Sequence, residues 1–172
     1  WNGDRPDPAA YTLLLRAAYF AVKEVSPSLP VLLASLAFSE GDGQEAINDL
    51  LFLEALYENG ASDYFDVLAS HPYGFGRAPE EEPDANRLNF RRLELHRAIM
   101  ERFDDGGKPV WITEMGWRTD APQVADAWQI VDEHQQAAYT LRAIDFAKSH
   151  YSWLERMAFW ELNADADLYG YA

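Results

Sequence analysis

The sequence predicts an α/β fold, because segments with helical and strand-like hydrophobic spacing alternate along its 172 residues. Four segments repeat apolar residues at helical spacing, and a short apolar run follows each of them. These runs are nearly continuously apolar, which is typical of parallel strands that are covered on both faces. Polar residues end each run, and in parallel α/β folds the carboxyl ends of the strands form the active face.

The predicted elements begin with a helix that starts at Asp7 and Pro8, an N-cap residue followed by a proline in the first turn, and continues to Val25. The other helices are predicted over 44–59, 87–103 and 132–150. The strands are predicted over Val31 to Phe38, Phe65 to His71, Pro109 to Thr113 and Arg156 to Leu162. No linker divides the chain, so we expect a single domain over 1–172.

This order of elements fits two architectures. One is a small, open, doubly wound sheet, and the other is half of a barrel, since a complete barrel has eight strands and typically ~250 residues. The hydrophobic pattern alone does not choose between them.

The composition limits the class of ligand. The net charge of −15 argues against nucleic acid and anionic membranes as partners, and a neutral ligand is the simplest to reconcile with it. The chain has no cysteine, which excludes disulfides, thiolate metal sites and cysteine nucleophiles. The first residues lack a charged segment followed by an apolar one, so no signal peptide is expected in the sequence. It also has no run of the ~20 apolar residues that a membrane span needs. The chain does not begin with Met, so we expect it to be a piece of a longer protein, and its compartment is left open.

Polar side chains at the ends of the predicted strands mark the candidate site. They are Ser39-Glu40, His71-Pro72-Tyr73, Glu114-Met115-Gly116-Trp117 and Glu161-Leu162-Asn163. Strand alternation places Val110, Ile112 and Glu114 on one side of the third strand, and Val67, Ala69, His71 and Tyr73 on one side of the second. If both sides face inward, Glu114, His71 and Tyr73 converge.

A carboxylate, an imidazole and a phenol beside indole rings suit carbohydrate chemistry. Sugars present apolar ring faces that stack on Trp, and hydroxyls that need fixed polar partners. Retaining hydrolysis of a glycoside needs two carboxyl groups roughly 5–5.5 Å apart, one as nucleophile and one as acid/base.

Three segments resemble clan A glycoside hydrolases of the cellulase and xylosidase kind, which have a (β/α)8 barrel. The stretch from Lys108 to Trp117 is similar to the seventh-strand nucleophile motif, and the stretch from Phe65 to Gly74 to the sixth-strand His-x-Tyr motif. Phe159-Trp160-Glu161-Leu162 resembles the eighth strand. The resemblance runs over nearly the whole chain, and it implies a half-barrel that corresponds to strands five to eight.

The resemblance also implies roles for particular residues. Glu114 would be the nucleophile, Tyr73 would hydrogen-bond it, and His71 would contact the substrate or the carboxyl network. Trp160 would be the stacking platform, and Trp117 would line the sugar subsite. The partner would be a carbohydrate substrate, and no cofactor or metal is implied.

One family motif is missing from the sequence. The acid/base glutamate of the family lies in an Asn-Glu-Pro motif at the end of strand four, and the 172 residues contain no such motif. By the resemblance, strands one to four and the last helix are absent. An open half-barrel exposes its apolar concave face, so we expect either a homodimer or association with the missing N-terminal half.

These residues also have other interpretations. Glu114 could pair with a lysine or arginine, and His71 and Tyr73 could be a strand-end pair that is satisfied by local hydrogen bonds. Trp160 could be part of the core, and Trp111 is expected to pack against a helix. Glu40 and Glu161 are weak candidates for the second carboxylate.

Other functions are open as well. The chain could bind carbohydrate without catalysis, or belong to an unrelated α/β-barrel enzyme with Glu114 as general base. The latter predicts a phosphate-binding glycine loop, which Gly116 alone does not make. The spacing of His71, His96, His134 and His150 matches no zinc motif, and no nucleotide-binding or nucleophile-elbow motif is present.

Overall fold

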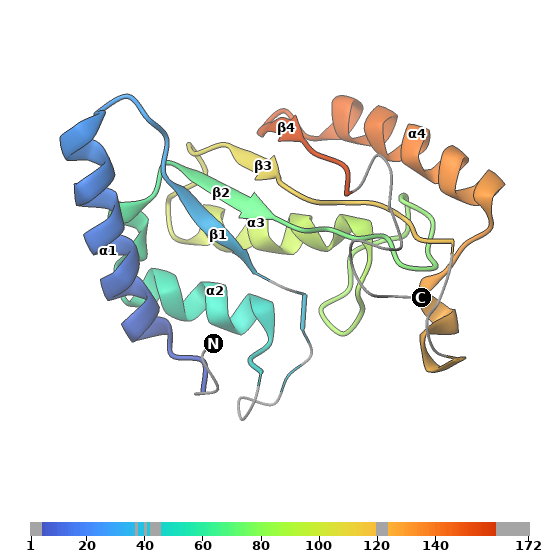
Figure 1. Ribbon diagram of the computed structural model, residues 1–172, viewed down its shortest axis with the longest axis horizontal. Helices are drawn as coiled ribbons and strands as arrows, with labels where there is room; N and C mark the ends of the chain where they lie inside the picture. Colours follow the sequence, from blue (N-terminus) through green and yellow to red (C-terminus); the bar gives the residue numbers. More distant parts are fainter. Residues whose placement is uncertain (1–4, 37, 40, 42–45, 120–123, 161–172) are drawn as a thin grey trace, which may run out of the picture.

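The computed structural model describes residues 5–36, 38–39, 41, 46–119 and 124–160. Within these ranges the α-helices are α1 (Pro8–Val25), α2 (Asp49–Glu58), α3 (Leu93–Arg102) and α4 (Glu133–His150). The strands are β1 (Leu32–Leu36), β2 (Val67–Ser70), β3 (Val110–Ile112) and β4 (Leu154–Met157). Short 3-10 helices lie at η1 (Ala61–Tyr64), η2 (Phe90–Arg92) and η3 (Val124–Gln129). Figure 1 shows these elements along the chain.

The four strands form one sheet in the order β1-β2-β3-β4, and every neighbouring pair is parallel. A helix lies between each pair of consecutive strands along the chain, so the predicted arrangement of parallel β/α units is confirmed. Sequential neighbours in a parallel sheet are the arrangement of a barrel wall, and the sheet is consistent with part of a (β/α)8 barrel.

Helix caps decide which of the predicted helix boundaries are right. The Asp7 carboxylate accepts hydrogen bonds from the backbone N–H groups of Ala9 and Ala10, and α1 begins where the sequence predicts. Asp132 and Gln135 form a capping box at the start of α4, which also agrees with the prediction.

Two helices begin later than predicted. Helix α2 begins at Asp49 instead of residue 44, because the Asn48 side chain caps it through the Leu50 N–H. Helix α3 begins at Leu93 instead of residue 87, since a 3-10 turn from Phe90 precedes it.

The fourth strand was predicted too far along the chain. It covers Leu154–Met157 instead of Arg156 to Leu162, and 161–162 lie outside the described residues. The charged pair Glu155 and Arg156 interrupts the apolar run, while Leu154 packs against both hydrophobic clusters of the core. Partial burial of Leu154 and Met157, at the two ends of this edge strand, therefore sets its register, while Glu155 and Arg156 between them are exposed.

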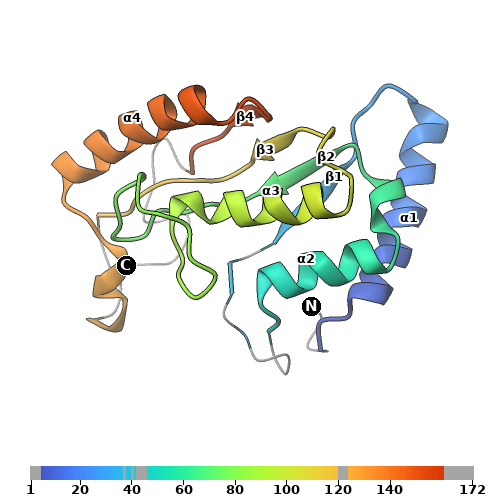
Figure 2. The ribbon, with the colours of Figure 1, turned by 180° about the vertical axis from the view of Figure 1, so that it is seen from behind.

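All four helices pack against one face of the sheet. The first core cluster joins Leu15 of α1, Leu53 of α2 and Met100 of α3 to strand residues Leu33, Leu68 and Val110. The second joins Ala143 and Ala147 of α4 and Leu93 of α3 to Ile112. The two views agree: α2 and α3 lie behind the strands in Figure 1 and in front of them in Figure 2.

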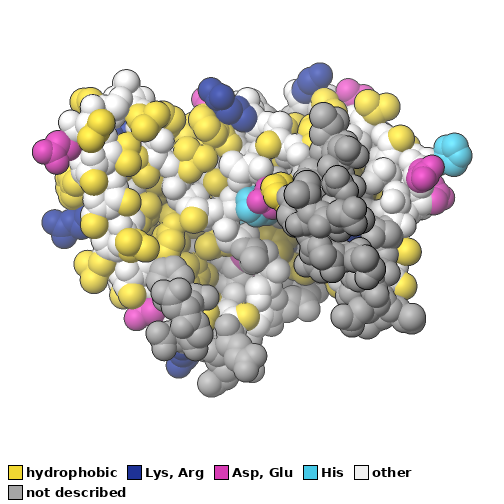
Figure 3. Space-filling model, in the orientation of Figure 1, with side chains coloured by type: hydrophobic (Ala, Val, Ile, Leu, Met, Phe, Trp, Pro, Cys, Tyr) yellow, Lys and Arg dark blue, Asp and Glu magenta, His cyan; other side chains and the backbone are white. Residues whose placement is uncertain are grey.

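The opposite face of the sheet carries no described helix. It is turned toward the viewer in Figure 3, where hydrophobic side chains gather over α1 and the first strands. Of the described helices, none is long and apolar enough to cross a bilayer.

Candidate active site

The structure brings Glu114, Tyr73 and His71 together at the carboxyl ends of β2 and β3. The Tyr73 Oη donates a hydrogen bond of 2.6 Å to Glu114 Oε2. The His71 Nδ1 lies 3.6 Å from the same oxygen. About a third of the Glu114 side chain is exposed, so a ligand can reach it. Among the described residues, no lysine or arginine forms an ion pair with Glu114, which argues against the interpretation as a surface ion pair.

These residues meet for a different reason from the one that strand alternation suggested. Val110 and Ile112 were expected to face inward with Glu114, but both are buried in the core clusters on the helix side. Thr113 follows Ile112 and points the other way, toward His71, whose Nε2 lies 3.0 Å from Thr113 Oγ1. Strand β3 ends at Ile112, so Glu114 reaches Tyr73 from the loop and not from the strand.

Two hydroxyl groups of the site were not predicted from the sequence. The Thr113 Oγ1 lies 2.8 Å from Ser35 Oγ of β1, although β2 lies between these strands. A bulge in β1 makes this contact possible, because Leu33 pairs with Leu68 and Leu36 pairs with Ser70. Leu33 and Leu36 both pack on the helix side, which leaves Ser35 on the opposite face. The bulge has no signature in the sequence, so the pattern of side chains could not have revealed this contact.

The electrostatics of the site keep a proton on Tyr73. Burial raises the pKa of the Tyr73 hydroxyl well above its ordinary value of 10.0, and the hydrogen bond and negative charge of Glu114 raise it further. The phenol therefore remains a hydrogen-bond donor to the carboxylate at any physiological pH.

Burial also keeps His71 neutral near pH 7. Burial lowers the pKa of the imidazole below 6.5, and this outweighs the nearby Glu114 carboxylate, which acts to raise it. A neutral imidazole carries one N–H, and the charge of Glu114 favours placing it on Nδ1. The Nε2 atom then accepts a hydrogen bond from the Thr113 hydroxyl, and Thr113 Oγ1 accepts one from Ser35.

This chain of hydroxyls predicts an effect of Thr113→Val on the His71 ring. Valine has the shape of threonine without its hydroxyl, so Nε2 loses its donor and the proton shifts toward Nε2. One hydrogen bond contributes roughly 0.5–1.5 kcal/mol, so the ratio of the two tautomers should change by roughly 2- to 10-fold. Nitrogen-15 NMR of the His71 ring measures this ratio. Thr113→Ser keeps the hydroxyl and should restore the wild-type shifts. Identical shifts in all three proteins would refute the hydrogen bond from Thr113 to His71.

The two predicted sugar-binding tryptophans lie in different surroundings. Trp160 is 51% exposed, and its backbone N–H donates to the Met115 carbonyl beside the Glu114 loop. Trp117, which was expected to line a subsite, is only 4% exposed, and that role stays a prediction. Its indole belongs to the second core cluster, and its Nε1 donates to the Arg77 carbonyl. A Cβ on Gly74 would lie 2.0 Å from this indole, so Trp117 packs directly under the loop that carries Tyr73.

Trp111 was expected to pack against a helix, and this prediction is wrong. Its Nε1 donates to Glu155, and the Arg156 guanidinium lies 4.3 Å from the ring centroid. Both partners are exposed residues of β4, and Trp111 belongs to neither core cluster.

Neither candidate for the second carboxylate of the mechanism can be placed in the structure. Glu40 and Glu161, the two weak candidates, both lie outside the described residues. Within the described ranges, no three His, Asp or Glu side chains lie close enough together to hold a metal ion.

Comparison with solved structures places this fold among glycosidases. A glucosidase from Croceicoccus marinus superposes with a TM-score of 0.63 at 23% identity, over 94% of this chain and 30% of that one. A GH128 (subgroup II) endo-β-1,3-glucanase from Sorangium cellulosum superposes with a TM-score of 0.59 at 17% identity, over 92% of this chain and 53% of that one. No family model and no curated protein matches the chain. The chain thus has a glycoside hydrolase-like fold, and it spans about a third to a half of the length of these two enzymes.

Proposed function

We propose that this chain forms part of the catalytic domain of a retaining glycoside hydrolase in which Glu114 is the nucleophile. The observation that carries the proposal is the 2.6 Å hydrogen bond from Tyr73 Oη to Glu114 Oε2, at the carboxyl end of a parallel sheet. This edge is where α/β-barrel enzymes bind their substrates. The glycosidase neighbours support the proposal at the level of the fold.

The contacts of Glu114 indicate which oxygen reacts. Tyr73 and His71 both approach Oε2, so Oε1 is the oxygen that we expect to attack the anomeric carbon. As the new C–O bond forms, the bond to the leaving oxygen breaks, and an acid elsewhere in the protein protonates that oxygen. Water then attacks the same carbon, the conjugate base of that acid takes the proton, and Glu114 is released as a carboxylate.

Tyr73 and His71 position the nucleophile in this mechanism. The Tyr73 hydroxyl remains protonated, so it holds Oε2 in place without neutralising Glu114. The His71 Nδ1 lies 3.6 Å from the same oxygen, and the contact of Nε2 with Thr113 fixes the orientation of the ring. Exposed Trp160, next to the loop, is proposed as the stacking surface for the sugar.

A glucose-based substrate is the first to test, since both neighbours are named for action on glucosides or glucans. The test is the stereochemistry of hydrolysis of an aryl β-glucoside by the protein at its full natural length. Proton NMR during the first minutes should show β-glucose as the initial product. Initial α-glucose would contradict the retaining mechanism. Binding of glucosides without any hydrolysis would favour a non-catalytic carbohydrate-binding chain, which the missing Asn-Glu-Pro motif also suggests.

A further inference from the structure

A cleft opens at the same end of the sheet as the candidate active site. Its volume is about 370 Å³, within the range of roughly 300–1,000 Å³ that is usual for ligand pockets. It is lined by Phe38 and Ser39 after β1, by Arg77 in the loop after β2, and by Asn86, Arg87 and Trp128. The segments after β1 and β2 leave the same end of the parallel sheet, the end that carries Tyr73 and Glu114.

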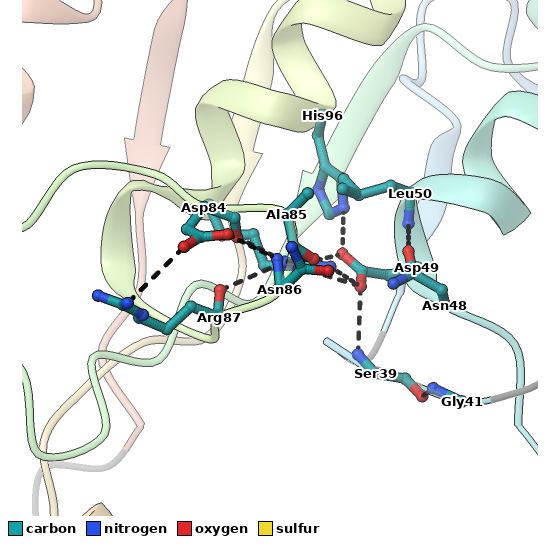
Figure 4. Close-up of polar contacts among 11 residues, drawn as sticks. Ser39, Gly41, Asn48, Asp49, Leu50, Asp84, Ala85, Asn86, Arg87 and His96 are labelled. Atoms are coloured by element: carbon teal, nitrogen blue, oxygen red, sulfur yellow. Dashed lines mark hydrogen bonds and ion pairs between the residues drawn. The ribbon is translucent and has the colours of Figure 1, made fainter.

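A buried ionic cluster fixes two walls of this cleft. The Asp49 carboxylate accepts hydrogen bonds from the Arg92 Nη2 at 2.8 Å and from the Ser39 N–H at 3.2 Å. The His96 Nε2 lies 2.8 Å from its other oxygen. The Arg92 Nη1 donates to the backbone carbonyls of Asp84, Ala85 and Arg87, which belong to the opposite wall. Figure 4 shows Asp49 between His96 and Ser39, with the 84–87 loop alongside.

This cluster is costly to bury, and its position suggests why it is present. The side chains of Asp49 and Arg92 have no exposed surface. Buried ion pairs seldom contribute more to stability than hydrophobic residues of the same size, but they do fix geometry. Here the fixed geometry is that of the Ser39 wall and the 84–87 wall, so the cluster holds the cleft open in one shape.

The third wall is an aromatic pair with a strained backbone. Trp128 is 53% exposed and stacks on Phe75, with ring centroids 5.3 Å apart and planes 26° apart. Phe75 has a φ of 52°, a conformation that a bulky residue rarely adopts and that is more common at functional sites. A Cβ on Gly76 would lie 2.5 Å from the Trp128 carbonyl, so only glycine allows this close approach. One face of the indole is thus supported by Phe75, and the other is available to a ligand.

The charges in the cleft balance one another. Arg77 and Arg87 both bind the same Glu81 oxygen, at 2.8 and 3.1 Å, and Arg87 also lies 3.8 Å from Asp84. Two guanidinium groups and two carboxylates leave no net charge, but they leave N–H donors beside the indole. An aromatic face next to neutralised hydrogen-bond donors suits an uncharged ring that carries hydroxyl groups.

We propose that this cleft is a second saccharide subsite, which binds a neutral sugar unit of the same substrate chain with Trp128 as its platform. The proposal rests on the proposed function of Glu114 and extends it, because it makes an oligosaccharide, and not a single glycoside, the preferred ligand.

The test measures affinity against sugar chain length by calorimetry. The full-length protein carries Glu114→Gln, so that the ligands are not cleaved, and the probes are β-1,3- and β-1,4-linked gluco-oligosaccharides of one to four units. Affinity should rise with length. Trp128→Ala should weaken binding of the longer probes by roughly tenfold, and Trp128→Phe, which keeps a ring, by much less. Phe20→Ala removes an aromatic ring of similar exposure, 55%, on α1, and should leave the affinities unchanged.

The outcomes separate the subsite from the proposed function. Affinities that do not rise with length, or that rise equally in Trp128→Ala, would overturn the subsite, even if aryl glucosides are hydrolysed with retention. A rise with length that depends on Trp128, in a protein that hydrolyses no glucoside, would support the subsite and overturn the catalytic role of Glu114. Failure to bind any of the probes would overturn the subsite for these neutral glucans.

Discussion

Glu114→Gln should reduce kcat for aryl glucoside hydrolysis by roughly three or more orders of magnitude in the full-length protein. Glutamine keeps the size of the side chain and can still accept the hydrogen bond from Tyr73 Oη. It removes the charged oxygen that bonds to the anomeric carbon. Because the site keeps its shape, KM should change far less than kcat. Initial-rate kinetics on a series of leaving groups measures both constants.

The matched control is Glu155→Gln. Glu155 is an exposed carboxylate on the neighbouring strand β4, where it accepts a hydrogen bond from Trp111. The substitution removes one negative charge near the sheet, as Glu114→Gln does, but it leaves the contacts of Tyr73 and His71 intact. A similar, small loss of activity in both variants would show that Glu114 is not the nucleophile.

Arg92→Met should lower the free energy of unfolding by about 3–5 kcal/mol, because it leaves the Asp49 carboxylate buried without its guanidinium partner. Methionine fills part of the volume but supplies no donor. The same change frees the three backbone carbonyls that Arg92 binds. Urea titration followed by fluorescence measures the difference.

An exposed ion pair provides the control for this substitution. Arg102 lies 2.8 Å from Glu54 and its side chain is 57% exposed, so Arg102→Met should cost at most about 1 kcal/mol. Equal losses in the two variants would mean that the Asp49 cluster contributes no more than a surface pair.

The same cluster sets an acid limit for the fold. Burial alone would raise the pKa of Asp49, but hydrogen bonds from His96 and Arg92 outweigh it and lower the pKa from 3.8 to about 2. A carboxyl with a lowered pKa stabilises the folded state above its unfolded pKa, and this contribution is lost as the pH falls from 3.8 toward 2. The difference corresponds to roughly 2 kcal/mol. Arg92→Met should reduce this contribution to the acid-unfolding curve but not abolish it, because the hydrogen bond with His96 remains.

Local signals in the sequence predicted much of the fold. The caps at Asp7 and Asp132 are made by side chains within three residues of the backbone groups that they bind, so the starts of α1 and α4 could be foreseen. The start of α2 was wrong, because Asn48 competes with the apolar periodicity that continues before it. The fourth strand was misplaced, since Leu154 is partly buried by contacts that only the assembled sheet provides.

The candidate site was also predictable in part, because its main residues lie in short sequence motifs. The motif around Glu114 and the spacing of His71 and Tyr73 identified three residues that the fold brings together. Their inward direction was assigned from ideal alternation, which fails where β3 ends at Ile112. Ser35, Thr113 and the Asp49–Arg92–His96 cluster were missed, because their contacts join residues 43 to 78 positions apart.

The central claim, that Glu114 is a covalent nucleophile, is tested most directly by trapping the glycosyl-enzyme. An activated 2-deoxy-2-fluoro aryl β-glucoside has a leaving group that needs little acid assistance, so the nucleophile can become glycosylated even where the acid is weak. Peptide mass spectrometry should show one added fluoroglucosyl group on the peptide that contains Glu114, and none in Glu114→Gln. A label on a different carboxylate, or no label on a protein that hydrolyses glucosides with retention, would contradict the assignment.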